Sequence, residues 1–273
     1  MSKKVTILAI ILASTLSQIV GQGIKNELTI LTGVGNIKRQ DLVFSPFIHS
    51  DFTPINLGLE FTRNAEFHQN LKLRYTTFNP ILNSPFEYSV NGKTAIAPHH
   101  YFTCIDLDYS FGKKIKITKN FTTQIGAIVA NDVQLLNYAY GRLGSFGYYS
   151  SFGLGGFVSR EYMLAENVFI SGKFALPLLN WISRSPYLVN DDEFIENISS
   201  HSDLKSLLAF IEDGKLASIN EIQSFDLEVD FNYHFHKSWA IGLNYLFEFA
   251  HLKKPRNLLS YRNSIYFTTK LKF

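Results

Sequence analysis

The residues of this chain that could do chemistry are carboxylates and histidines that stand close together in the sequence. Asp106 and Asp108 are separated by one residue, and Asp226 and Asp230 precede His234 in a second segment. An extended chain rises about 3.3 Å per residue, so His234 lies roughly 13 Å from Asp230. General acid–base catalysis needs hydrogen-bond contact between its partners. The spacing therefore argues against a carboxylate–histidine catalytic unit.

Other candidate groups are equally sparse. His236 and Ser238 could pair as a base and a nucleophile, but they fall where a turn is expected. His234 and His236 share a strand face, yet no third metal ligand is evident and structural zinc needs four. The lone Cys104 excludes an internal disulfide and a multi-cysteine metal site. No glycine-rich phosphate-binding motif occurs. We predict no catalytic residue, no metal and no cofactor.

Composition places the chain among folded proteins without a nucleic-acid partner. Of its 273 residues, 46% are hydrophobic and 15% are aromatic, which is incompatible with a disordered chain. The 26 basic residues nearly balance the 23 acidic ones, and two of the basic residues, Lys3 and Lys4, lie in a leader. Nucleic-acid binding requires a basic surface that this balance does not supply.

Residues 1–22 have the layout of a secretory signal peptide. Two lysines precede an apolar run over residues 5–12, and small and polar residues follow, with cleavage expected near Gly21. The run is shorter than the roughly 20 residues that cross a bilayer as a helix. We therefore expect export and a mature domain of residues 23–273.

Strict alternation of apolar and polar residues recurs through the mature chain, which predicts strands with two different faces. The clearest example places Phe225, Leu227, Val229 and Phe231 between charged or polar neighbours. The expected strands are 27–36, 55–65, 69–79, 101–112, 120–131, 147–160, 167–177, 223–236, 239–251 and 260–273.

Strand length and connection length favour a membrane barrel over a soluble β-sandwich. Several strands exceed the 5–6 residues usual in soluble sheets, whereas a tilted transmembrane strand needs about 9–11. Short connections alternate with long ones, as do the periplasmic turns and outer loops of such barrels. The long ones are 37–54, 80–100, 132–146 and 178–222. We predict an all-β, ten-stranded antiparallel transmembrane barrel; a hairpin within 178–222 would make it twelve.

The end of the chain carries a resemblance to a known class. Phe267, Leu271 and the terminal Phe273 lie on one face of the last strand. This pattern resembles bacterial outer-membrane β-barrel proteins, whose assembly machinery recognises an aromatic C-terminal residue on such a strand. The leader and the Asn-, Lys- and Phe-rich composition resemble those of Bacteroidota. The resemblance covers the whole mature chain, matches no named subfamily and implies an outer-membrane location in contact with lipid.

If the apolar face of each strand meets lipid, the polar face lines the lumen. Charges of both signs fall on that face, and ion pairing among them is expected because unpaired charge in a dry lumen is costly. In a barrel this small the side chains largely fill the interior, so we expect a filled or gated lumen rather than an open pore. The predicted lumen charge network is Lys72, Arg74, Asp106, Asp108, Lys173, Asp226, Glu228, Asp230, Glu248 and Arg262.

The 178–222 insertion is the only segment with helical periodicity. Leu204, Leu207, Leu208 and Ile211 form one stripe of a predicted helix in an extracellular loop. The stripe could pack on the rim of its own barrel, enter the lumen as a plug, cover the mouth as a lid or bind a protein partner.

Three functions are compatible with this sequence. The leading hypothesis is a non-enzymatic structural or accessory barrel that presents loops to a partner or ligand, as the resemblance implies for barrels of secretion or uptake assemblies. The alternatives are a narrow solute channel and a surface hydrolase acting on lipid or peptide. The aspartate pairs resemble those of omptin proteases and His236–Ser238 resembles the His-x-Ser of lipid A deacylases, but His234 is displaced from the aspartates and Trp239 replaces the expected Asn.

Overall fold

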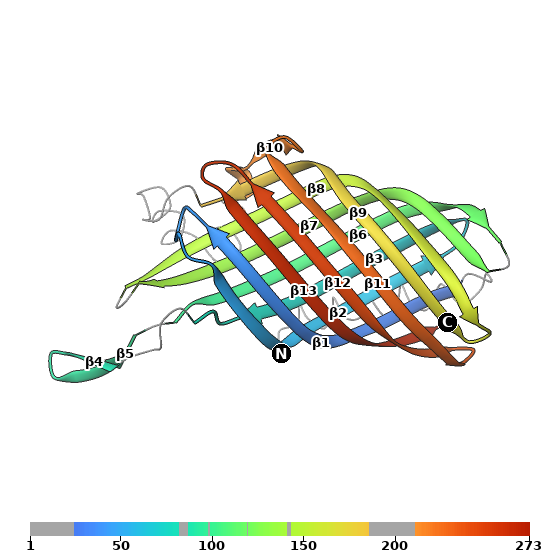
Figure 1. Cartoon of the computed structure of the whole chain (residues 1–273), viewed down its shortest axis with the longest axis horizontal. Helices are drawn as coiled ribbons and strands as arrows, with labels where there is room; N and C mark the ends of the chain where they lie inside the picture. The colour runs from blue at the N-terminus through green and yellow to red at the C-terminus, as the bar shows by residue number, and fades with distance from the viewer. Residues whose placement is uncertain (1–24, 82–86, 98, 119, 141–142, 186–210) are drawn as a thin grey trace, which may run out of the picture.

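The computed structural model describes residues 25–81, 87–97, 99–118, 120–140, 143–185 and 211–273. Alternating side chains allow each long strand to bury one face and expose the other. Ten of these strands form the barrel (Figure 1): β1 (Lys25–Asp41), β2 (His49–Asn64), β3 (Phe67–Phe78), β6 (Tyr101–Ile117), β7 (Phe121–Tyr140), β8 (Leu143–Ala165), β9 (Val168–Arg184), β11 (Ile222–His236), β12 (Trp239–Leu252) and β13 (Leu258–Lys272).

The sheet closes on itself. Each barrel strand pairs antiparallel with its neighbour along the chain, and β1 pairs with both β2 and β13. Asn26 and Phe273 exchange two backbone hydrogen bonds of 2.9 Å, which joins the ends of the chain. We call the end of the barrel that holds these residues and the short turns the terminus end, and the opposite end the loop end. Closure leaves no unpaired edge along the barrel wall.

The prediction of a ten-stranded antiparallel barrel is confirmed, and all ten expected strands are present. Their bounds differ most at the loop end. The expected connection over 132–146 is mostly strand, because β7 and β8 stay paired from Phe121↔Tyr162 to Tyr140↔Leu143. Residues 178–184 of the predicted insertion likewise continue β9. The strands of 12 to 23 residues exceed what a bilayer requires, so the barrel wall continues beyond it.

The side chains that face the interior differ between the middle of the barrel and the part of the wall that extends beyond the bilayer length. Towards the loop end the inward positions become apolar, as at Ile37, Phe102 and Leu136, which are all fully buried. These side chains form one cluster with Phe44, Phe78, Cys104 and Tyr138. A second cluster joins strands β8 to β13 through Tyr149, Ile182, Ala217, Ile222, Leu252 and Leu258. The loop end of the barrel therefore has a packed core like that of a soluble protein.

Two small elements lie outside the ten-stranded wall. β4 (Glu87–Val90) and β5 (Lys93–Ile96) form a separate two-stranded sheet, which projects from the barrel in Figure 1. Asn91 and Gly92 connect them with φ angles of 52° and 75°, the left-handed backbone that an Asn-Gly hairpin turn adopts. β10 (Lys215–Ser218) pairs with the loop end of β9, so it extends the wall and adds no barrel strand.

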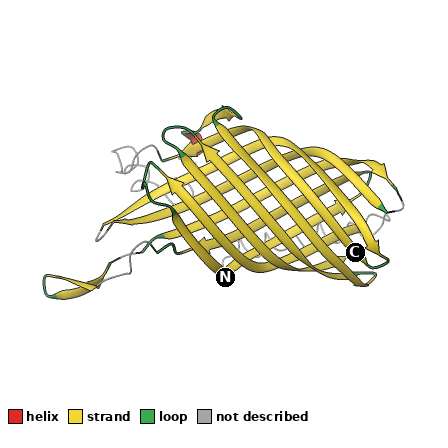
Figure 2. Ribbon diagram, viewed as in Figure 1, coloured by secondary structure: helices red, strands yellow, loops and turns green. Residues whose placement is uncertain are grey.

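The described residues contain almost no helix (Figure 2). None of their helices has the length and hydropathy needed to cross a membrane. Of the predicted helical stripe, Leu204, Leu207 and Leu208 lie outside the described residues, as does the predicted signal peptide. Ile211 lies in a short helical turn.

Candidate functional site

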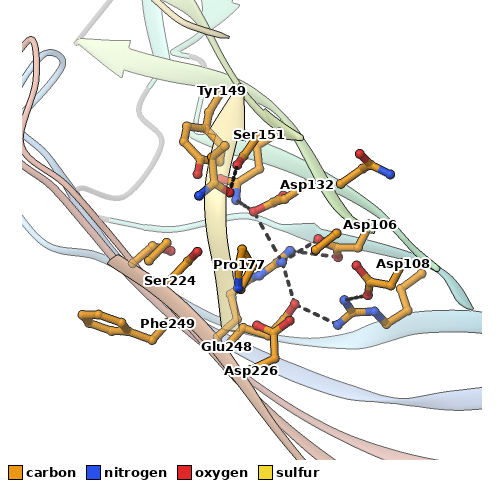
Figure 3. A pocket seen from close by; sticks show the side chains of 18 residues that line it. Asp106, Asp108, Asp132, Tyr149, Ser151, Pro177, Ser224, Asp226, Glu248 and Phe249 are labelled. Atoms are coloured by element: carbon orange, nitrogen blue, oxygen red, sulfur yellow. Dashed lines mark hydrogen bonds and ion pairs between the residues drawn. The ribbon is translucent and has the colours of Figure 1, made fainter. Parts of the chain in front are cut away.

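A network of buried ion pairs crosses the middle of the barrel (Figure 3). Arg262 of β13 donates two hydrogen bonds, of 2.6 and 3.1 Å, to the carboxylate oxygens of Asp106 on β6. Its Nη2 also donates to Glu248 Oε1 at 2.8 Å. Arg74 of β3 donates to the same oxygen and to Asp108 Oδ2, both at 2.8 Å. Two arginines therefore share one glutamate and tie separated parts of the wall together.

The carboxylates of this region outnumber its cations. A cavity of about 60 Å³ is lined by Asp106, Asp108, Asp132, Asp226 and Glu248, with only two arginines among them. Asp226 stands opposite Glu248 in the β11–β12 register, and the two side chains lie together in Figure 3. Within the described part of the chain, Asp226 has no ion pair closer than 4.0 Å. Asp226 is thus a carboxylate of this cavity that stands beside a like charge without an ion pair of its own among the described residues.

We expect Asp226→Asn to leave the barrel at least as stable as the original chain. The substitution removes a carboxyl group that faces Glu248, and like charges placed opposite each other across a strand pair are destabilising. The free energy of unfolding in detergent should change by less than about 0.5 kcal/mol or increase. Asp106→Asn is the matched comparison, because it breaks two bonds to Arg262 and should lower stability. A larger loss for Asp226→Asn than for Asp106→Asn would contradict this assignment.

A second ionic cluster lies nearer the terminus end. Lys72 on β3 pairs with Glu228 on β11 and approaches Glu60 Oε2 at 3.4 Å. Asn244 Nδ2 donates to Glu228 at 2.6 Å and to Asp230 at 2.8 Å. Lys173 donates to Ser110 Oγ at 3.3 Å. The adjoining cavity has only about 20 Å³ of free volume, enough for about one water molecule.

A third cluster closes the loop end. Arg39 pairs with Asp41 at 3.0 Å, Arg184 pairs with the other oxygen of Asp41, and all three side chains are almost fully buried. Asp41 also accepts the backbone N–H of Val43 at 3.1 Å, which turns the following loop inward. Phe44 of that loop stacks on Tyr138, with ring centroids 4.5 Å apart. The loop after β1 thereby becomes part of the core.

Every residue of the predicted lumen charge network lines one of three interior cavities. Four further interior charged residues lie outside the predicted network, because they fall in segments expected to be surface loops: Arg39, Asp41, Asp132 and Arg184. The signal that pointed to them is the period-two pattern, which continues beyond the roughly ten residues that cross a bilayer. Gln134, Leu136 and Tyr138 all face inward and are buried, although two of the three are apolar or aromatic.

The candidate catalytic groups do not assemble. His234 lies at the terminus end, with its ring 3.3 Å from Lys272 Nζ and 4.7 Å from the Phe169 ring centroid. None of the described residues around the central cavity is a histidine. His236 Nδ1 accepts the backbone N–H of Ser238 at 3.2 Å within a turn. In the described part of the chain, no three His, Cys, Asp or Glu side chains are grouped to hold a metal ion.

The predicted assembly residues and the insertion occupy opposite ends. Phe267 is 49% exposed on the outer face of β13, and Phe273, which directly follows β13, is 44% exposed. Leu271 is half-buried between them. At the loop end, Trp181 Nε1 of β9 donates to the backbone carbonyl of Ile211 at 2.8 Å. A Cβ on Gly214 would lie 2.2 Å from the same indole nitrogen. The returning part of the insertion is thus held against the barrel rim.

Glu221 forms two ion pairs on the surface of the loop end, the longer of them with Lys215 Nζ at 3.9 Å. Lys254 Nζ is 2.7 Å from Glu221 Oε1, and this hydrogen bond lowers the pKa of the Glu221 carboxyl below its usual value. Both side chains are solvent-accessible, so the pair contrasts with the buried clusters and contributes little to stability.

Comparisons with known proteins place this architecture among bacterial outer-membrane barrels. No family model and no curated protein matches the chain. Outer membrane protease OmpT from Escherichia coli is similar in structure, with a TM-score of 0.54 and 8% identity over 92% of this chain and 96% of that protein. Neisserial surface protein A aligns with a TM-score of 0.36 and 11% identity over 92% of this chain and 98% of that one.

A third similar structure is the β domain of the Bordetella autotransporter BrkA, with a TM-score of 0.38 and 10% identity over 91% of this chain and 98% of that one. Nothing in these matches supports the resemblance to Bacteroidota. At such low identity the likeness to OmpT concerns the fold and not the protease activity. The chain has the ten-stranded antiparallel barrel fold found in bacterial outer-membrane proteins.

Proposed function

We propose that this chain is a non-enzymatic outer-membrane barrel that is exported by a cleaved leader and presents surface segments to a protein partner. The observation that carries the proposal is that the interior is filled from the middle of the barrel to its loop end, where buried ion pairs and apolar clusters follow one another. Because these interior contacts serve the stability of the barrel, the surface loops are the part of the molecule that can bind a partner.

The outer face supports the membrane location. Leu227, Val229, Phe231 and Tyr233 alternate along β11 and are 36–44% exposed, and similar residues follow on neighbouring strands. Water-soluble proteins rarely expose contiguous apolar surface of this extent. Lipid is therefore the partner proposed for the barrel wall, and the aromatic end of β13 is proposed to contact the assembly machinery.

The non-enzymatic role rests on the separation of the candidate groups. Asp106 and Asp108 are held by arginines, and His234 lies eight residues from Asp226 on one strand, a distance of roughly 27 Å. A general base must reach the proton that it removes. The solute channel is disfavoured for another reason, since the central cavities hold only a few water molecules.

The hairpin β4–β5 is the surface segment best suited to a partner. An isolated two-stranded hairpin is marginally stable in water, yet this one exposes Val90 by 46% and Ile96 by 66%. A partner that covers these side chains would stabilise it. The 178–222 insertion is proposed as a second contact, because Trp181 holds its returning end at the same rim. A secretion or uptake assembly would provide such a partner.

The proposal is tested by gentle detergent extraction of the tagged protein from its native membrane, followed by mass spectrometry. The original chain should carry a stoichiometric companion. The companion should be lost from a Val90→Ser/Ile96→Ser variant and kept by a Ser89→Ala/Thr94→Ala variant of the same hairpin. Deletion of residues 202–214 tests the insertion separately. A protein that is recovered alone, or a companion that survives both hairpin and insertion changes, would overturn the proposed role.

A further inference from the structure

The largest described cavity opens at the terminus end of the barrel. It has about 490 Å³ of free volume and ends inward at the ionic cluster around Lys72. We call it the vestibule. Residues near both chain ends line its mouth, including Asn26, Glu27 and Lys272. Among the described residues, the ion pairs and apolar clusters given above separate it from the loop end, so its opening lies at the terminus end.

One wall of the vestibule carries a continuous row of cationic and hydrogen-bonding side chains. Lys114 on β6 pairs in register with Gln124 on β7, Gln124 with Ser159 on β8, and Ser159 with Lys173 on β9. All four residues line the cavity. Neighbouring strands lie about 4.8 Å apart, so two lysines flank an amide and a hydroxyl across four adjacent strands. We call these four residues the cationic row.

Neither lysine of the row forms an ion pair within 4.0 Å among the described residues, although Glu228 stands opposite Lys173 in the β9–β11 register. Lys173 Nζ donates to Ser110 Oγ at 3.3 Å and lies 5.1 Å from the centre of the Phe157 ring. Lys114 forms no ion pair within 4.0 Å of its amine in the described part of the chain. Glu161 also lines the mouth, but it is not within ion-pair distance of either lysine.

The other carboxylates that line the vestibule already have partners. Glu27 pairs with Lys270 at 3.5 Å and with Lys272 at 3.8 Å. Glu60 and Glu228 pair with Lys72, and Asp230 accepts an amide hydrogen bond from Asn244. The ion pairs of these groups within 4.0 Å are with Lys72, Lys270 and Lys272, and none is with Lys114 or Lys173. The vestibule is therefore asymmetric: its ion pairs gather around these three lysines, and the ammonium groups of the cationic row form none among the described residues.

From this asymmetry we propose that the cationic row binds a small oxyanion, a phosphate or carboxylate group of a solute that enters from the terminus end. Ammonium groups in a partly desolvated cavity are stabilised by a counter-anion. Charge-assisted hydrogen bonds from lysines to such oxygens are strong, and Gln124 and Ser159 supply further donors between them. The vestibule is large enough for a small metabolite around the anionic group.

The test follows the lysines by NMR in the folded, micelle-bound protein after reductive ¹³C-dimethylation, which keeps their charge. Inorganic phosphate and acetate are titrated separately, against sodium chloride at matched ionic strength. The signals of Lys114 and Lys173 should shift saturably, and the anion that binds tighter identifies the preferred group. Lys114→Gln and Lys173→Gln should each weaken binding about tenfold, and the double variant should abolish it.

A Lys253→Gln/Lys254→Gln variant at the loop end is the matched control and should bind like the original chain. A Lys114→Arg/Lys173→Arg variant, which keeps the charge, should retain binding and separates loss of the site from loss of the fold. Shifts that follow ionic strength alone would overturn the proposal. So would equal shifts at Lys253 and Lys254, or undiminished binding by the folded double glutamine variant.

Discussion

Replacing Arg262 with alanine should lower the free energy of unfolding by about 3–5 kcal/mol. The guanidinium is only 6% exposed and holds Asp106 and Glu248, with Asp132 at 3.6 Å. Its removal leaves buried carboxylates that share a single remaining arginine, Arg74. Urea unfolding in detergent micelles, followed by the fluorescence of the two tryptophans, measures the loss.

Two companion variants show whether the loss comes from uncompensated charge. Lys254→Ala removes a cation that is 62% exposed in its ion pair with Glu221, so stability should stay unchanged within measurement error. Adding Asp106→Asn to Arg262→Ala should cost less than the two single changes together, because the second change removes a charge that the first left unpaired. Strict additivity would mean that Arg262 acts through packing alone.

Phe44→Ala should open the loop end and expose Cys104 to thiol reagents. Phe44 is 4% exposed, stacks on Tyr138 and belongs to the same cluster as the fully buried Cys104. Truncating a buried phenylalanine costs about 3–5 kcal/mol. If the free energy of local opening falls by about 3 kcal/mol, the rate of Cys104 labelling should rise roughly a hundredfold. Cys104 is the chain's single cysteine, so the reaction of the folded protein with a maleimide reports on this one position.

Phe47 provides the control within the same loop. It is 64% exposed, so Phe47→Ala removes no core contact and should leave the labelling rate unchanged. Fast labelling of Cys104 in the original chain would show that the loop end is open and would favour the channel hypothesis. A slow rate in the Phe44→Ala variant would mean that the barrel wall alone, without the inward loop, excludes the reagent.

The candidate site shows where sequence reasoning succeeds and where it stops. Period-two alternation placed Arg74, Asp106 and Arg262 on one face, and all three lie inside the barrel. It could not pair them, because Arg262 and Asp106 are 156 residues apart and meet only through the curvature and stagger of the closed sheet. The Asn91–Gly92 turn is different, since this dipeptide is a strong hairpin signal and the hairpin was predictable.

The sequence by itself predicted ten antiparallel strands, with twelve left open, and the polar face of each strand that meets the interior in the middle of the barrel. These follow from local properties, because alternating side chains and short turns constrain neighbouring strands directly. The tertiary structure alone decided the length of the wall, the partners of the interior charges and the closure by Phe44. Inward leucines and tyrosines beyond the bilayer resemble loop residues in sequence. They become a core only when residues from several strands pack together, four strands and the loop after β1 in one cluster and six strands in the other.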